Sequence, residues 1–402
     1  MVYDVCIVGT GLWGSAAARH ATKSGRKVCL IGPREPTEKE RPSRDIFSSH
    51  YDAGRNVRKY QGTDHIRSLL TMRTLESLKN LEQITGIKLF SDVGHLFYGK
   101  DIDGQLTAIA KEGGRFLSAS EVQDLYPFLD TSKYGDQAFL FPQDAGFVNP
   151  RLVVAAQQKV AKEQGCDIID DVVESVEEES YQTDKEAVMK IITKSGNIFW
   201  SKKVLLCCGV FTQLKDLLPR DLELDLKVDG TFVVKLELGE EDVARLSTMP
   251  TGTSITDPEL NCYFLPPIKY PDGKTYMKIG PGYFYQTRLT TLEDVKRWYL
   301  SATNQDYVDK LKDIVLSIVK GITPLSVQSE TCACSRTSTS LPYCHMVSPR
   351  LGLAVGGYGF GAMMSDEIGR MAAKMIGGDE NWNMDIPMEK LKARYVTQPA
   401  KL

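Results

Sequence analysis

The distribution of apolar positions predicts strands and helices that alternate at both ends of the chain. An apolar strand over 5–8 is followed by an alanine-rich helical stretch and a second strand over 27–31. An apolar strand over 203–208 ends at a glycine, and a strand over 353–355 precedes a helix over 365–375. Uninterrupted apolar strands are typical of a parallel sheet that is covered on both faces. The pattern therefore predicts an α/β unit built from both ends of the chain.

The middle of the chain has a different character. Residues 225–285 alternate apolar and polar positions, which is typical of half-buried strands. Residues 89–100 are predicted to form a hairpin that leads into this β-rich unit. The other expected elements are helices over 63–83 and 150–163, strands over 167–169, 172–177 and 187–193, and a helical section over 289–318.

Composition and charge exclude several classes of protein. The 402 residues are 42% hydrophobic and 25% charged, an ordinary globular composition with length enough for two domains. The net charge of −3 gives no electrostatic reason to bind nucleic acid or an anionic membrane surface. No apolar run is long enough to span a bilayer, and the N-terminus lacks the features of a signal peptide.

The first strand leads directly into a glycine-rich loop. The loop reads Gly9-Thr10-Gly11-Leu12-Trp13-Gly14 and opens the alanine-rich helix. In this strand–loop–helix context the first glycine makes the tight turn, the second admits a pyrophosphate, and the third allows close helix packing. The N-terminus of the following helix adds N–H groups and a favourable dipole for the anion. The segment therefore predicts a dinucleotide site.

The end of the second strand leaves the identity of the dinucleotide open. An acidic residue that holds the ribose is usual there, but the sequence has Gly32-Pro33-Arg34-Glu35. A small residue followed by arginine can indicate the 2′-phosphate of NADP, whereas Glu35 could hold the ribose of FAD. Both cofactors are compatible with this stretch.

Two thiols and a guanidinium share one side of a predicted strand near the C-terminus. Residues 330–340 read ETCACSRTSTS, so Cys332, Cys334 and Arg336 point the same way at strand periodicity. A metal site, a redox pair, a disulfide and a covalent cofactor link are all possible. The chain has nine cysteines, five histidines and no CxxC pair, so a structural metal is not expected, and most of the thiols are expected to be reduced and buried.

Several local segments together resemble the FAD-dependent amine oxidases of the D-amino acid oxidase superfamily. The branch that the chain is most similar to contains monomeric sarcosine oxidase, peroxisomal pipecolate/sarcosine oxidase and the fructosyl amino acid oxidases. The segments that carry the resemblance are VGTGLWG at 8–14, SHYDAGR at 49–55 with Arg58, FVNPRL at 147–152, YMKIG at 276–280, ETCACSRTSTS at 330–340 and GGYGFG at 356–361.

The resemblance implies a Rossmann-type, discontinuous FAD-binding domain with an inserted β-rich substrate domain. The first is expected to comprise residues 1–88, 148–219 and 329–402, and the second 89–147 and 220–328. The expected reaction is hydride transfer from a C–N bond to flavin N5, followed by reduction of O2 to H2O2 and hydrolysis of the imine. Lys278, Arg55 and Tyr263 are the expected catalytic residues. Lys278 matches the family lysine that promotes O2 reduction.

The resemblance also assigns residues to FAD and suggests a covalent link. Cys334 is expected to carry the flavin, and a register slip of one alternate position would give that role to Cys332. The expected cofactor-binding residues are Gly9, Gly11, Leu12, Trp13, Gly14, Glu35, Ser49, His50, Arg55, Val173, Gly209, Cys334, Gly357, Gly359, Phe360, Gly361 and Met363.

Substrate recognition departs from the family pattern. Met363 occupies the position of the family lysine that binds the substrate carboxylate, and methionine cannot bind a carboxylate. Arg58 and Arg336 are the alternative anion holders, because a planar guanidinium suits a carboxylate. Tyr263 is expected over the substrate. The expected substrate is a small secondary amine or an N-alkyl, cyclic or glycated amino acid, with or without a carboxylate.

The C-terminal Ala400-Lys401-Leu402 resembles a peroxisomal address and predicts binding to the import receptor. A peroxide-producing oxidase suits that organelle, and the cytoplasm is the alternative location. The protein is expected to be a monomer. Three other functions remain open: an FAD-dependent dehydrogenase with an acceptor other than O2, an NADP-dependent reductase, and a non-catalytic FAD-binding scaffold.

Overall fold

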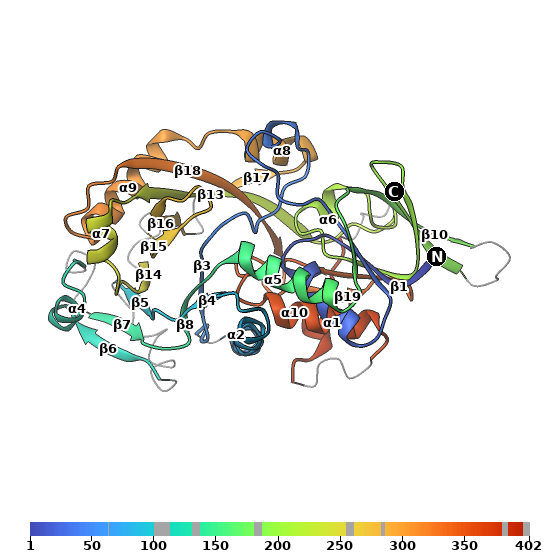
Figure 1. The fold of residues 1–402 in the computed structure, drawn as a ribbon, viewed down its shortest axis with the longest axis horizontal. Helices are drawn as coiled ribbons and strands as arrows, with labels where there is room; N and C mark the ends of the chain where they lie inside the picture. The colour runs from blue at the N-terminus through green and yellow to red at the C-terminus, as the bar shows by residue number, and fades with distance from the viewer. Residues whose placement is uncertain are drawn as a thin grey trace, which may run out of the picture.

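The structure is a computed structural model, and two large sheets dominate it. It describes all of residues 1–402 except 63, 100–112, 131–136, 181–186, 255–260, 283–285, 380–384 and 397–402. The C-terminal tripeptide therefore lies outside the described residues. Within the described residues, an eight-stranded sheet and a nine-stranded sheet lie towards opposite ends of the long axis, with a three-stranded sheet as well (Figure 1).

The eight-stranded sheet has a parallel centre formed by both ends of the chain, as the apolar pattern predicted. β1 (Val2–Val8) lies between β2 (Val28–Ile31) and β12 (Ile198–Leu206), and β20 (Leu351–Val355) extends β12 in parallel. The other strands are β9 (Asp167–Ile169), β10 (Val173–Ser180), β11 (Ala187–Thr193) and β19 (Tyr343–Met346).

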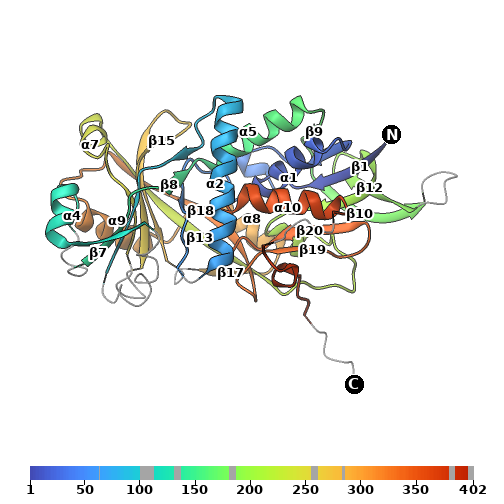
Figure 2. The same cartoon turned by 90° about the horizontal axis from the view of Figure 1, so that it is seen from below.

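Three helices pack together beside this sheet (Figure 2). They are α1 (Leu12–Lys23), α5 (Pro150–Glu163) and α10 (Ser365–Ile376). α5 begins as its sequence predicts, because the Asn149 side chain accepts a hydrogen bond from the Leu152 amide and Pro150 takes the first helical position. The helices bury the apolar strands from water.

The nine-stranded sheet forms the β-rich unit. Its longest strands are β13 (Leu226–Glu237) and β18 (Ser326–Thr337), which pair antiparallel along their whole length. The others are β5 (His95–Tyr98), β6 (Arg115–Ser118), β7 (Gln137–Phe141), β14 (Thr251–Ser254), β15 (Cys262–Lys269), β16 (Thr275–Pro281) and β17 (Thr287–Leu289). Its associated helices are α4 (Ala119–Leu125), α7 (Glu240–Arg245), α8 (Leu292–Leu300) and α9 (Gln305–Ile318).

The predicted hairpin over 89–100 is wrong. β4 (Phe90–Ser91) pairs with β8 (Ala145–Val148) in the three-stranded sheet, together with β3 (Arg55–Arg58). β5 pairs with β7 and β14 in the nine-stranded sheet. The two strands belong to different sheets because each finds its partner far along the chain, and local periodicity does not specify that partner.

The remaining helices agree with those predicted from the sequence, except that one predicted helical section is two separate helices. α2 (His65–Thr85) starts at Asp64, which accepts a hydrogen bond from the Arg67 amide, and ends at Gly86 in the left-handed conformation. The helical section expected over 289–318 is two helices, α8 and α9, each with its own side-chain cap. Short elements complete the chain: η1 (Arg41–Ser43), α6 (Phe211–Leu214) and η3 (Met388–Leu391).

The mixed α/β class, with a Rossmann-type unit and a β-rich unit, is confirmed. The expected division into domains stays a prediction, and its boundary at 329 falls inside β18. Among the described residues, no helix combines the length and apolarity needed to cross a membrane.

Candidate functional site

Two glycines of the loop after β1, Gly9 and Gly14, have no room for a side chain. Gly9 has φ +112°, and a Cβ there would lie 2.4 Å from the Cys207 carbonyl oxygen. A Cβ on Gly14 would lie 1.8 Å from the Gly9 carbonyl oxygen. α1 then begins at Leu12 without a side-chain cap, so its first N–H groups are open to an anion. The predicted roles of these glycines match this geometry.

A second glycine loop lies beside the first. The Trp13 indole donates a 2.8 Å hydrogen bond to the Gly361 carbonyl, and a Cβ on Gly357 would lie 3.6 Å from the same indole. α10 follows with no side-chain hydrogen bond at its N-cap. α1 and α10 pack closely, since a Cβ on Gly369 would lie 2.4 Å from the Ala16 Cβ. Of the two helices that follow these adjoining loops, only α1 has an open N-terminus among the described residues, because the first turn of α10 contains the buried acids Asp366 and Glu367 and the Glu367 amide donates to the Thr74 hydroxyl.

The acid missing from the end of β2 has a steric explanation. A Cβ on Gly32 would lie 2.7 Å from the Thr10 amide nitrogen and 2.8 Å from its hydroxyl. Arg34, the residue that suggested NADP, is engaged by Glu40 and Asp170 at 2.5 and 3.1 Å. Its guanidinium is therefore committed to carboxylates of the protein itself.

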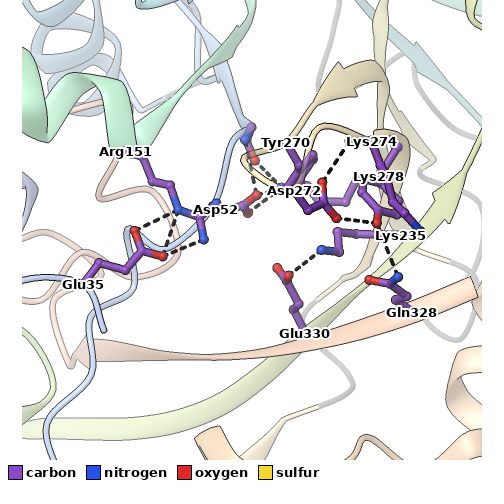
Figure 3. Close-up of polar contacts among 12 residues, drawn as sticks. Glu35, Asp52, Arg151, Lys235, Tyr270, Asp272, Lys274, Lys278, Gln328 and Glu330 are labelled. Carbon is purple, nitrogen blue, oxygen red and sulfur yellow. Dashed lines mark hydrogen bonds and ion pairs between the residues drawn. The ribbon is translucent and has the colours of Figure 1, made fainter. Parts of the chain in front are cut away.

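Glu35, the expected ribose ligand, pairs with Arg151 at the start of α5. The contact is bidentate, with Nε and Nη2 of Arg151 donating to the carboxylate at 2.7–2.9 Å (Figure 3). The pair is only partly exposed. It orients the Glu35 carboxylate, and a ribose hydroxyl would have to share that carboxylate with Arg151.

Residues 48–50 lie between the glycine loop and strand β18, and they contact both. Ser49 donates a 2.6 Å hydrogen bond to the Ala333 carbonyl of β18. His50 is buried, and its Nδ1 lies 2.6 Å from the Ser48 hydroxyl. Burial, with the charges of Arg151 and Arg55, lowers the pKa of His50 to about 3, so the ring is neutral. A Cβ on Gly11 would be 3.9 Å from His50 Nδ1, which places this ring against the loop.

A buried ionic cluster centres on Asp52. Lys278 on β16 donates to Asp52 Oδ2 at 2.7 Å, and Arg55 Nη1 lies 3.0 Å from the same oxygen. The Tyr270 hydroxyl donates to Oδ1 at 2.8 Å (Figure 3). Lys278 is fully buried and also donates to the Gly54 carbonyl. The lysine therefore points into the protein, not into solvent.

The titration behaviour of the cluster follows from burial and charge. Burial lowers the pKa of Lys278 to about 8, although Asp52 acts in the opposite direction. Burial acts to raise the pKa of Asp52, but Lys278 and Arg55 outweigh it and hold the pKa of this carboxyl well below its usual range. The pKa of Arg55 is raised by Asp52 against the opposing effect of burial. At neutral pH all three are charged, and the trio carries one net positive charge.

Tyr263 on β15 lies beside this cluster. A Cβ on Gly280, its cross-strand neighbour, would lie 2.4 Å from the Tyr263 ring, so glycine is required for the ring to cross β16. Burial raises the pKa of Tyr263 to about 12, and the Arg55 charge opposes the rise. Three expected catalytic residues, Lys278, Arg55 and Tyr263, are thus brought together.

The two thiols of β18 have different neighbours. Arg55 Nη2 lies 3.5 Å from Cys332 Sγ. Burial raises the pKa of Cys334 to about 11, while Arg336 acts to lower it. Arg336 Nε lies 2.9 Å from Asp229 Oδ2, and its guanidinium stacks 4.8 Å from the Tyr358 ring centre. The expected common face of Cys332, Cys334 and Arg336 is confirmed by the alternating burial along β18.

The other expected residues are dispersed. Met363 is buried in the apolar core beside α1 and α10, in the same cluster as Trp13. Arg58 stacks over the Phe97 ring at 5.0 Å, at the edge of the aromatic cluster of the β-rich unit. Phe360 stacks under the Arg67 guanidinium at 4.3 Å. The loop glycines after β12 and β20, Gly209 and Gly359, have φ +56° and +80°.

A cavity of about 720 Å³, lined mostly by charged and polar residues, adjoins the loop after β2. Val172, next to the expected cofactor residue Val173, contributes to its wall. Asp45 lies in the wall of this cavity and forms ion pairs of 2.8 Å with both Lys194 and Lys296. Val173 itself is buried at the start of β10.

Sequence reasoning missed several partners of the predicted residues. Asp52 binds Lys278, and Tyr270 donates to Asp52. Asp229 binds Arg336, and Arg151 binds Glu35. Asp52 lies inside the segment 49–58 that carried the family resemblance, so an acid between Ser49 and Arg55 was the available signal. Arg151 likewise lies inside the segment 147–152 that carried the resemblance, whereas no local pattern indicates the contacts of Tyr270 and Asp229.

Fold and site together define a flavoprotein of the Rossmann type, and the comparisons agree. The chain belongs to the family of FAD-dependent oxidoreductases described as DAO, whose profile matches residues 4–375. It is 29% identical over 172 residues to monomeric sarcosine oxidase of Streptomyces avermitilis, covering 41% of this chain and 42% of that protein. It is 25% identical over 226 residues to N-methyl-L-tryptophan oxidase of Yersinia pestis, covering 54% and 56%. The matches span about half of these relatives.

Solved structures share the fold over almost the whole chain. NikD, an amino acid oxidase of nikkomycin biosynthesis, in its open form has a TM-score of 0.77 at 19% identity, covering 99% of this chain and 98% of that one. Fructosamine oxidase (Amadoriase II) of Aspergillus fumigatus has a TM-score of 0.73 at 17% identity, covering 97% and 89%. The expected family and the expected fold are both confirmed.

The described residues fit the FAD that the family implies. Gly9 and Gly14 of the first loop leave no room for a Cβ, and this loop offers the N-terminus of α1, which has no side-chain cap, to a pyrophosphate. The neutral His50 and the cationic Arg55 lie on the segment that runs from this loop to β18. FAD, a dinucleotide that carries the polar flavin ring at one end, suits this arrangement.

Proposed function

We propose that this protein is an FAD-dependent oxidase of a small secondary amine or of an N-alkyl, cyclic or glycated amino acid. The observation that carries the proposal is the fully buried, charged Lys278 beside Arg55 and Tyr263. Burying a cation is costly unless it is paired, and buried groups with a shifted pKa are concentrated at functional sites. The names of the relatives, which are oxidases of N-methylated and glycated amino compounds, support the substrate class.

The chain's own residues have separable roles in this reaction. Bound FAD would supply the two-electron acceptor for the amine, to be reoxidised by O2. Lys278 and Arg55 place fixed positive charge where negative charge develops during O2 reduction, and a dry site makes that charge effective. No strong base is needed, because the amine has only to be neutral when it is oxidised.

Two arginines are candidates for a substrate carboxylate, and their surroundings differ. Arg336 is already paired with Asp229, so a carboxylate there would compete with a carboxylate of the protein. Arg58 lies against Phe97 beside an aromatic cluster. Both arginines stay candidates, with Tyr263 over the substrate, and Met363 in the apolar core makes no polar contribution.

The test compares two buried lysines that face each other across adjacent strands. Lys278 on β16 lies opposite Lys235 on β13, which has its own acid, Glu330. We expect Lys278→Met to slow the reoxidation of reduced enzyme by O2 at least a hundredfold, while anaerobic reduction by the amine persists. Lys235→Met should change reoxidation far less. Equal O2 reactivity in wild type and Lys278→Met would refute the role of Lys278, and reduced wild-type enzyme that O2 does not reoxidise would refute the oxidase proposal.

The same assay separates the alternatives. A protein that is reduced by amines but reoxidised only by an added acceptor is a dehydrogenase. Intact flavin without turnover over a panel of N-methyl, cyclic and glycated amino acids indicates a scaffold. Purification without flavin but with NADP would support the reductase, which the pairing of Arg34 disfavours.

We propose a covalent flavin link at Cys334, with Cys332 as the alternative. The alternative is supported by the position of Cys332, whose Sγ lies 3.5 Å from Nη2 of the candidate catalytic residue Arg55. Mass spectrometry of denatured Cys334→Ser and Cys332→Ser proteins decides, since only one substitution should release the flavin. Flavin that leaves denatured wild type would rule out both.

We also propose a monomeric enzyme imported into peroxisomes through Ala400-Lys401-Leu402. An N-terminal fluorescent fusion should colocalise with a peroxisomal marker, and deletion of the three residues should leave it cytosolic. Cytosolic fluorescence of the intact fusion would contradict this location. The sedimentation coefficient of the purified protein tests whether it is a monomer.

A further inference from the structure

The carboxylate of Asp52 is the common partner of the two cations at the candidate site. It is 2% exposed and is contacted by Lys278, Arg55 and Tyr270, from three different segments of the chain. The Gly54 amide adds a fourth, longer contact at 3.3 Å. The carboxylate is therefore saturated with donors and cannot turn towards a ligand without losing them.

We propose that Asp52 is a positioning residue that keeps Lys278 and Arg55 charged together, holds the Lys278 ammonium against the Gly54 carbonyl, and thereby sets the alkaline limit of the O2 reaction. This inference rests on the oxidase function proposed above. It extends that function because it assigns to an acid, which does not itself meet the substrate, control over the protonation of the catalytic lysine.

Geometry shows why one acid has to serve both cations. Lys278 and Arg55 each lie within 3.0 Å of the same oxygen, Asp52 Oδ2, so without it two buried cations would face each other. Arg55 acts to lower the pKa of Lys278, as burial does, and Asp52 is the principal opposing influence. Removal of the carboxylate would leave the ammonium without its closest counter-charge, and it would lose its proton.

The other acid near Lys278 cannot replace Asp52. Glu330 is directed to Lys235, which stacks over the rings of Tyr270 and Tyr276 at 4.6 and 4.7 Å. Its side chain is 35% exposed, so water screens its charge. The titratable and charged groups that surround the cluster are Asp52, Arg55, Tyr263, Tyr270, Lys235, Glu330 and Cys332.

The test measures the protonation of Lys278 without relying on turnover. Flavin-loaded protein labelled with ¹⁵N-lysine is titrated by NMR, and the buried ammonium signal is assigned by its loss in Lys278→Met. We expect Asp52→Asn to lower the pKa of Lys278 by about 1 to 3 units. The pH above which O2 reoxidation slows should fall by the same amount. Asp52→Glu, which keeps the charge, should restore much of the wild-type pKa.

A matched control removes a different carboxylate from the same region. Asp272 accepts a 2.7 Å hydrogen bond from Tyr276 and makes no contact with Lys278 (Figure 3). Asp272→Asn should leave the Lys278 signal and the pH profile unchanged. An unchanged Lys278 pKa in Asp52→Asn overturns the inference.

Poor folding of Asp52→Asn also gives a decisive outcome. If the variant fails because an ammonium is left buried without its partner, the double variant Asp52→Asn/Lys278→Met should fold. If the double variant fails while Lys278→Met folds, Asp52 has another structural role and the inference is overturned. The proposed function fails separately, if O2 does not reoxidise the reduced wild-type enzyme, whatever the NMR titration shows.

Discussion

Replacing Lys278 by methionine should change how the stability of the protein depends on pH. Methionine has a similar length and carries no charge, so the substitution removes the buried titration and keeps most of the packing. The pKa of Lys278 is about 8 in the folded protein against an ordinary value of 10.5. Between these two pH values the unfolded chain binds one more proton than the folded chain, so the free energy of unfolding rises with pH.

The magnitude follows from the gap between the two pKa values. A gap of about 2.5 units corresponds to about 3 kcal/mol, since one unit is about 1.4 kcal/mol. Below pH 8 the folded protein bears the full cost of the buried ammonium, and above pH 10.5 that cost is gone. The stability of wild type relative to Lys278→Met should therefore rise by up to about 3 kcal/mol from pH 7.5 to pH 10.5.

Urea unfolding of the flavin-loaded proteins at several pH values measures this difference, and other titrating groups cancel between the two proteins. Lys274→Met is the matched control, because Lys274 is exposed, pairs with Glu237 and has a raised pKa. Its difference from wild type should stay flat up to pH 10. A flat difference for Lys278→Met as well would refute the assigned burial and charge of Lys278.

Three further substitutions test the fold and the site. Gly14→Ala should yield protein with little bound flavin, measured by the ratio of flavin to protein absorbance, because the backbone 1.8 Å from the new Cβ cannot move aside; normal flavin content would contradict this. Asp366→Asn should cost about 3 to 5 kcal/mol in urea unfolding, because Arg19 loses its buried 2.7 Å partner; a loss below about 1 kcal/mol would argue against the pair. Gly280→Ala should displace the Tyr263 ring, raise KM for the amine and leave O2 reoxidation intact, and an unchanged KM would remove Tyr263 from the substrate site.

Local sequence signals located the dinucleotide unit well. The loop from Gly9 to Gly14 and the capping pair Asn149-Pro150 act within a few residues of themselves, so their positions are readable from the sequence. The hairpin expected over 89–100 failed because strand pairing depends on distant partners. The alternation along β18 was predictable because strand geometry has period two.

The chain's own order of residues determined which elements form, which glycines admit a nucleotide, and that Cys332, Cys334 and Arg336 share one face. Only the folded chain decided which side chains meet those residues. Arg336 meets Asp229 of β13, and Lys278 meets Asp52 from a segment more than two hundred residues earlier. Periodicity determines the side of a strand on which a charge emerges. The partner of a buried charge is whatever tertiary packing brings within about 3 Å, because an unpaired charge cannot stay buried.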